Sequence, residues 1–203
     1  MRVKSFQCGE NFTNCYIVYE ENTKDCFLVD VSDRLSREYF LFLENNSLKP
    51  LYLLLTHGHY DHTKDILSFK KKYPDTKIVI SQKDYENILN NTYVFCKNEL
   101  FCKPDILVTD FDSLDFSGKK IKVLATPGHT DGSVCYLYEN MCFCGDTVFS
   151  GSVGRTDLPT GSFTEILKSV NKIKNLGDYK LYPGHMEETD IKTEKRYNHF
   201  FNI

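Results

Sequence analysis

The stretch LLLTHGHYDHTKD, residues 53–65, ends a run of leucines with three histidines and two aspartates. The whole chain has six histidines, so half of them fall in this one stretch. The continuous apolar run before them is typical of a strand that is covered on both faces. Imidazole nitrogens and carboxylate oxygens bind zinc and similar metals, so the stretch predicts a metal-binding turn at the end of a buried strand. Its candidate ligands are His57, His59, Asp61 and His62.

Three more turns contain residues of the same kind. His129 and His185 each follow Pro-Gly after a strand-like run, and Asp146 follows Gly at the end of MCFCG. Turns at the ends of rigid strands can aim such side chains at one point. Five histidines and two aspartates exceed the four positions of a structural zinc, and cysteine is absent from these turns. The sequence therefore predicts two metal ions with open positions for catalysis.

Strand-like runs alternate with helical patterns along the chain. Residues 2–6, 14–19 and 25–31 predict an antiparallel meander, and a helix is expected from about Thr63 to Tyr73, before Pro74. Many strands with helices between two strand-rich halves indicate two sheets flanked by helices. The other expected strands are 50–56, 77–81, 110–116, 120–126, 133–138, 141–146 and 180–183, and the other expected helices are 36–45, 82–90, 163–176 and 187–200.

The helix expected at 163–176 has a start and a stop in the sequence. Ser162 is the expected N-cap, Glu165 follows three residues later, and Gly177 ends the pattern. Its apolar positions follow helical spacing, so we interpret them as core residues. They are Phe163, Ile166, Leu167, Val170, Ile173 and Leu176.

Composition limits the class of protein. A chain of 203 residues, 41% hydrophobic and 26% charged, is expected to form one globular domain, residues 1–203. Its net charge of -3, without long charged blocks, argues against nucleic-acid binding. No apolar run reaches the roughly 18 residues that span a bilayer, and no signal peptide is recognised, so we expect a cytoplasmic protein.

The eight cysteines form no CxxC pair, and most lie in apolar stretches. We expect reduced core thiols rather than disulfides. Cys142 and Cys144 alternate on a predicted strand whose face Asp146 continues, which leaves open a role for them beside the metal site.

Four motifs in a fixed order resemble a known family. HxHxDH at 57–62, PGHT at 127–130, GDT at 145–147 and PGH at 183–185 are similar to the metallo-β-lactamase-fold hydrolases. The stretch FCGDTVFSGSVGRTDLPTGS and the ending YPGH...TEKRYN resemble the small glyoxalase II-like (hydroxyacylglutathione hydrolase-like) branch. The resemblance spans the chain and implies an α/β (α+β) fold, the four-layer αββα sandwich.

By position, the resemblance implies a ligand set for two divalent metals, which would be zinc, with iron or manganese as alternatives. Asp30 matches a family aspartate that supports the metal-binding loops through hydrogen bonds, and capping a turn is its simpler role. The first metal would be held by His57, His59 and His129, the second by Asp61, His62 and His185, with Asp146 bridging them.

The resemblance also implies hydrolysis of a thioester such as S-lactoylglutathione by hydroxide shared between the metals. Asp61 or Asp146 would orient the attacking oxygen and accept its proton. The partner would be a small acyl or thioester substrate, with neither nucleic acid nor membrane, and the oligomeric state stays open. Arg155, with Lys or Tyr residues of 91–103, is expected to meet an anionic substrate, and a structural salt bridge is the alternative for Arg155.

Other activities of the same fold compete with this interpretation. Persulfide dioxygenases keep a similar ligand set but load one iron at the first site, so a complete second site favours the hydrolase. Lactonase and β-lactamase activities are less favoured, the latter because it usually accompanies export. A non-catalytic metal-binding protein would be expected to lack a ligand, and none is missing.

Residues 91–105 are the least regular segment and are expected to form a loop or lid.

Overall fold

The first of two six-stranded sheets is built from the N-terminal half of the chain. The structure is a computed structural model that describes residues 1–32, 37–93 and 102–203. The predicted meander is confirmed, because the first three strands are antiparallel, whereas the later strands pair in parallel. In spatial order the strands are β1 (Arg2–Cys8), β2 (Thr13–Tyr19), β3 (Asp25–Val29), β4 (Lys49–Leu54), β5 (Lys77–Ser81) and β6 (Ile106–Val108).

The second sheet comes from the C-terminal half and has the order β14-β13-β10-β9-β8-β7. A two-stranded sheet of β11 (Val148–Phe149) and β12 (Ser152–Val153) follows β10. These two strands, β14 and β6 were not predicted, because strands of two or three residues leave no periodic pattern in the sequence. The bounds are β7 (Ser113–Phe116), β8 (Lys119–Ala125), β9 (Val134–Tyr138), β10 (Met141–Gly145), β13 (Lys180–Pro183) and β14 (Thr189–Asp190).

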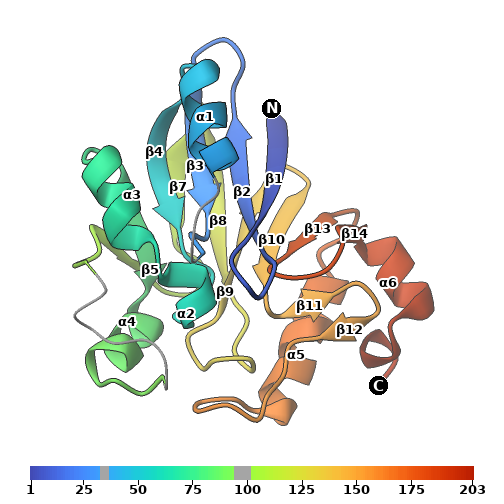
Figure 1. Ribbon diagram of the computed structural model, residues 1–203. Helices are drawn as coiled ribbons and strands as arrows, with labels where there is room; N and C mark the ends of the chain where they lie inside the picture. The colour runs from blue at the N-terminus through green and yellow to red at the C-terminus, as the bar shows by residue number, and fades with distance from the viewer. Residues whose placement is uncertain (33–36, 94–101) are drawn as a thin grey trace.

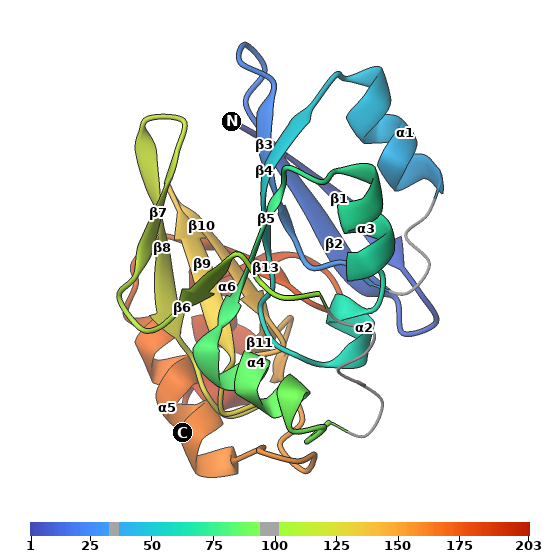
Figure 2. The ribbon, with the colours of Figure 1, turned by 90° about the vertical axis from the view of Figure 1, so that its left-hand side faces the viewer.

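Helices cover the outer faces of both sheets. Figures 1 and 2 show α1 and α3 on the outer side of the first sheet and α5 on the outer side of the second. The fold is thus the four-layer αββα sandwich. The helices are α1 (Arg37–Asn45), α2 (Tyr60–Thr63), α3 (Ile66–Lys72), α4 (Gln82–Leu89), α5 (Phe163–Lys174), α6 (Ile191–Tyr197) and the 3-10 helix η2 (His199–Phe201).

Three apolar clusters separate these layers. Alternate residues of a strand point to opposite faces, so β2 places Ile17 in the cluster beneath α1 and α3, and Tyr16 in the cluster between the sheets. β10 likewise places Phe143 between the sheets and Cys142 and Cys144 in the third cluster, beneath α5. These cysteines are therefore core residues, and their contacts do not support a role beside the metal site. The seven cysteines of the described ranges are thiols.

Two predicted helices are wrong in extent. The helix expected from Thr63 to Tyr73 begins only at Ile66, as α3, and the separate short helix α2 precedes it. At the break between them, the amide of Asp65 donates to the carbonyl of Val31 (3.4 Å). The helix expected at 187–200 is shortened to α6 because Thr189 pairs with Leu181 in β14.

The start of α5 is confirmed, since Ser162 Oγ accepts from the amide of Glu165. Ile166, Val170 and Ile173 are buried as expected, but Phe163 is 52% exposed. Phe163 lies in the first turn of the helix and meets Phe200 edge to face, outside the core.

Within the described ranges, no helix has the length and apolar content to cross a bilayer.

The inter-sheet cluster is expected to contribute most to stability through its aromatic rings. Phe27 is fully buried and meets Phe116, Tyr138 and Phe143 edge to face. Phe27→Ala should lower the free energy of unfolding by about 3–5 kcal/mol, because it removes these contacts and leaves a cavity. Phe111→Ala is the matched control, since that ring is 86% exposed, and it should cost less than about 0.5 kcal/mol. Equal losses in urea unfolding would contradict this assignment of the core.

Candidate metal centre

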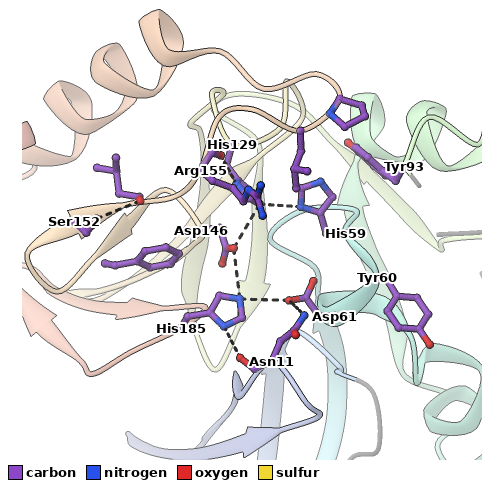
Figure 3. A pocket seen from close by; sticks show the side chains of 14 residues that line it. Asn11, His59, Tyr60, Asp61, Tyr93, His129, Asp146, Ser152, Arg155 and His185 are labelled. Carbon is purple, nitrogen blue, oxygen red and sulfur yellow. Dashed lines mark hydrogen bonds and ion pairs between the residues drawn. The ribbon is translucent and has the colours of Figure 1, made fainter. Parts of the chain in front are cut away.

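The turns after four strands meet at one end of the sandwich. The turn after β4 supplies His57, the turn after β8 supplies His129, and the ends of β10 and β13 supply Asp146 and His185. Figure 3 shows the last three of these side chains pointing toward one another, together with His59 and Asp61. All seven candidate ligands of the sequence analysis are therefore brought together from segments far apart in the chain.

The candidate ligands fall into three groups of three residues. Within each group, every residue has one potential ligand atom, and these three atoms lie within 4.8 Å of one another. Two of these groups have the composition implied by the resemblance for the first and second metals, and the third shares members with both. The groups are His57, His59 and His129; Asp61, His62 and His185; and His57, His62 and Asp146.

Asp146 reaches both sides of the centre with its two oxygens. Oδ1 lies 3.3 Å from His62 Nε2, and Oδ2 lies 3.4 Å from His129 Nε2 and 3.5 Å from His185 Nε2. Ligands about 2.1 Å from a tetrahedral metal are separated by roughly 3.4 Å. The spacing of these atoms therefore suits shared metal ligands.

Hydrogen bonds fix the orientation of three imidazole rings. The Nδ1 atoms of His129 and His185 lie 2.8 and 3.1 Å from the backbone carbonyls of Arg155 and Asn11, and His62 Nδ1 lies 2.8 Å from Asp30 Oδ2. Because these oxygens only accept hydrogen bonds, each Nδ1 acts as the donor. Each Nε2 is then left to face the centre, where the lone pair of the neutral ring can bind a metal.

Asp30 supports the turn that carries His57, His59 and His62, called here the first histidine turn, through hydrogen bonds. Its Oδ1 accepts from the amide of Thr56 (2.8 Å), and its Oδ2 accepts from the hydroxyl of Thr56 (2.8 Å) as well as from His62. Thr56 Oγ1 lies 3.1 Å from His57 Nδ1, so the carboxylate also fixes His57 through this hydroxyl. These contacts go beyond the capping of a turn.

The electrostatics of the centre favour bound cations. Burial opposes ionisation of Asp146 and Asp61, but nearby histidines, His62 foremost, lower both pKa values well below the usual range. Burial and the neighbouring His129 lower the pKa of His59 to about 3, which keeps that ring neutral. His57 Nε2 and Asp146 Oδ1 are buried and have no hydrogen-bond partner among the described residues. Two ionised carboxylates and these orphaned ligand atoms fit divalent metal ions.

A pocket of about 700 Å³ opens above the candidate ligands. One wall is apolar and comes from the β11–β12 turn and the segment after it, and Tyr93 lies beside His59. Arg155 also lines the pocket, and its guanidinium donates two hydrogen bonds of 2.7 Å to Asp157. Residues 94–101 of the expected loop or lid lie outside the described residues. The apolar wall contains Phe149, Val153, Leu158 and Pro159.

Several residues of the site were missed in the sequence. Asn11 donates to Asp61 Oδ2 (3.1 Å) and Thr56 connects Asp30 with His57, yet neither stands in a recognisable motif. Asp84 also contacts a histidine turn. Tyr93, in contrast, belongs to the segment 91–103 whose Lys or Tyr residues were expected to meet the substrate, and it lines the pocket beside His59. The only available signal for Asp84 was the Ser-x-x-Asp spacing of a helix start, which says nothing about its partners.

Comparisons with known proteins show similarity in sequence and in fold. The Metallo-beta-lactamase superfamily matches residues 8–185. Hydroxyacylglutathione hydrolase from Francisella philomiragia is 36% identical over 190 residues, which cover 91% of this chain and 68% of that protein. The crystal structure of BLEG-1 B3 metallo-beta-lactamase is similar with a TM-score of 0.89, at 30% identity and with 100% of both chains covered. ETHE1 from Myxococcus xanthus has a TM-score of 0.81 at 26% identity, covering 98% of this chain and 83% of that one.

Asp30→Asn should weaken both folding and metal binding. An amide cannot accept all the hydrogen bonds from Thr56 and His62, so we expect a loss of about 1–3 kcal/mol in the free energy of unfolding. Zn²⁺ affinity, measured by competition with a chelator, should fall about 10–100-fold. Asp115→Asn is the control, because that carboxylate is 83% exposed and pairs only with Lys120 among the ion pairs of the described residues. Unchanged Zn²⁺ affinity in Asp30→Asn would contradict the supporting role.

Proposed function

The chain belongs to the metallo-beta-lactamase superfamily, and on this premise we propose that it is a binuclear hydrolase that cleaves a thioester such as S-lactoylglutathione. The observation that carries the proposal is the contact of Asp146 with both ligand groups at the floor of a pocket. The similarity to hydroxyacylglutathione hydrolase supports the choice of a thioester.

The ligand roles follow from the grouping of the side chains, and zinc is the proposed metal because imidazole and carboxylate ligands suit it. When bound, the two ions would lower the pKa of a water molecule and polarise the carbonyl group of the substrate. The first ion would be held by His57, His59 and His129, the second by Asp61, His62 and His185, and Asp146 would contact both.

Asp61 and Asp146 are the proposed catalytic carboxylates. Asn11 and Thr13 donate to Asp61 Oδ2 (3.1 and 3.5 Å) and so fix the direction of that oxygen. Both carboxylates stay ionised at neutral pH, so each can accept a hydrogen bond from the attacking water molecule and orient it. The proposal also makes one of them the acceptor of the proton of that water molecule. A thiolate is a good leaving group, so the reaction does not require a dedicated protein acid.

The pocket suits a small molecule with an apolar portion. Its volume lies within the range of about 300–1,000 Å³ that is usual for small-molecule sites. Phe149 and Leu158 would contact the apolar part of the substrate, and Arg155 at the pocket would meet a carboxylate. The proposed partner is thus a small acyl or thioester molecule.

A mononuclear-iron persulfide dioxygenase is the second candidate function. The structural similarity to ETHE1 from Myxococcus xanthus is the observation that favours it. The group of His57, His59 and His129 would hold the single iron in that case. The completeness of the second group supports the hydrolase instead.

The test is metal content per chain, after purification without added metal, together with hydrolysis of S-lactoylglutathione under air. We expect two metal ions per chain and thioester turnover. His185→Ala should reduce the metal content to about one and the turnover by about 100-fold, because it removes a ligand. His199→Ala is the matched control, since His199 is exposed and lies outside the centre, and it should change neither value. One iron per chain, no hydrolysis and oxygen uptake with a persulfide would reject the hydrolase in favour of the dioxygenase.

Arg155→Gln tests the contact with an anionic substrate. We expect KM for S-lactoylglutathione to rise about 5-fold with kcat unchanged, as for a contact that is equal in ground and transition states. Arg2→Gln is the control, because Arg2 forms a similarly exposed ion pair, with Glu21, at the first strand. An unchanged KM in Arg155→Gln would assign Arg155 to its salt bridge with Asp157 alone.

A further inference from the structure

We propose that Asp84 is a positioning residue that fixes the two turns carrying the ligands of the first metal, His57, His59 and His129. This inference rests on the metal-binding part of the proposed function and is independent of the substrate. Asp84 lies in the first turn of α4 and is fully buried, although no ligand of the centre is on that helix.

The carboxylate of Asp84 joins both turns through one oxygen. Oδ2 accepts from the amide of Gly58, between His57 and His59, and from the hydroxyl of Thr130, directly after His129; both distances are 3.0 Å. The separation of the two turns is therefore set by a shared acceptor. His59 Nδ1 and His129 Nε2, which face each other across this junction, are 2.8 Å apart.

Two glycines allow this close approach. A Cβ at Gly132 would lie 2.5 Å from the amide nitrogen and 2.6 Å from Cγ of Asp84. A Cβ at Gly58 would lie 2.7 Å from the ring of Tyr93. The backbone of Gly58 is outside the left-handed region, so the close contact with Tyr93 explains glycine at this position.

Tyr93 extends the same arrangement to the pocket. Its hydroxyl donates to Asp84 Oδ1, and its ring meets the imidazole of His59 edge to face with 4.8 Å between the ring centres. Asn87 Nδ2 donates to Tyr93 (3.1 Å) and to Asp131 Oδ1 (2.7 Å), which attaches α4 to the His129 turn a second time. Asp84 thus acts on His59 through the backbone on one side and through an aromatic ring on the other.

Glu194 offers a matched control for a buried carboxylate. It is 1% exposed, and its carboxylate accepts from the backbone amide of Gly151 (2.9 Å), the hydroxyl of Thr189 (2.7 Å) and the side-chain amide of Asn198 (2.8 Å). It resembles Asp84 in burial and in its three donors, but none of these donors belongs to a histidine turn. Removal of Glu194 therefore tests the cost of losing a buried carboxylate that makes no direct contact with a histidine turn.

The experiment compares Asp84→Ala with Glu194→Ala in the full chain. Thermal unfolding of the metal-free proteins measures stability, and Zn²⁺ competition with a chelator and the visible absorption of bound Co²⁺ measure the centre. We expect both variants to lose stability, but only Asp84→Ala to lose Zn²⁺ affinity, by about 10-fold or more, and to change the Co²⁺ spectrum. Asp84→Asn should recover part of the affinity, because its oxygen can still accept from Gly58 and Thr130.

Equal Zn²⁺ affinity in the wild type and Asp84→Ala, or equal losses in Asp84→Ala and Glu194→Ala, would overturn the inference. If Asp84→Ala does not fold, Thr130→Val removes only the hydroxyl that joins Asp84 to the His129 turn, and an unchanged affinity there would overturn it as well. A wild-type chain that binds no Zn²⁺ would reject the proposed metal centre itself. Zn²⁺ binding without thioester hydrolysis would reject only the proposed reaction.

Discussion

The buried carboxylate of Asp30 is the contact on which the first histidine turn depends. Asp30 adopts a left-handed backbone (φ 59°) at the end of β3, where its own amide donates to the carbonyl of Leu54 in β4. This conformation is unfavourable for most residues, but aspartate tolerates it. The side chain then accepts two hydrogen bonds from Thr56 and one from His62. The start and the end of the metal-binding turn are thereby tied to neighbouring strands, and the desolvation of the carboxylate is offset by charge-assisted hydrogen bonds.

The candidate ligands could be predicted from the sequence because each lies in a turn after a strand-like run, and four of them fall within the six residues 57–62. The sandwich could also be predicted, since its strands follow periodic apolar patterns. The division of α2 from α3 could not, because it depends on the contact of Asp65 with Val31, which only the folded chain brings together. The role of Asp84 in the site could not be predicted for the same reason. Asp84 is one charged residue of a helix, and its burial arises from turns that are 26 and 46 residues away.

Asp30 and Asp84 support different parts of the centre. Asp30 fixes His62 directly and His57 through Thr56, whereas Asp84 fixes the backbone on either side of the interface between His59 and His129. Asp146, at the end of β10, is the carboxylate that contacts histidines of both sides. The metal-binding floor is therefore set by buried contacts within the two sheets and their connecting turns. The similarity to the BLEG-1 and ETHE1 structures extends over nearly the whole chain, and a shared fold does not by itself decide the reaction.

The apolar wall of the pocket has a separate origin. The backbone of the β11–β12 turn is fixed by α6 and the residue that follows it, since Glu194 accepts from the amide of Gly151 and Asn198 donates to the carbonyl of Ser152 (2.9 Å). Phe149 and Val153 of this turn line the pocket but lie outside the three ligand groups. A change in α6 therefore acts on the wall directly, and it reaches the ligands only through contacts such as that of the Arg155 carbonyl with His129 Nδ1. Because Glu194 and Asn198 hold the wall whereas Asp30 and Asp84 hold the histidine turns, substrate preference can change along this fold while the metal centre is retained.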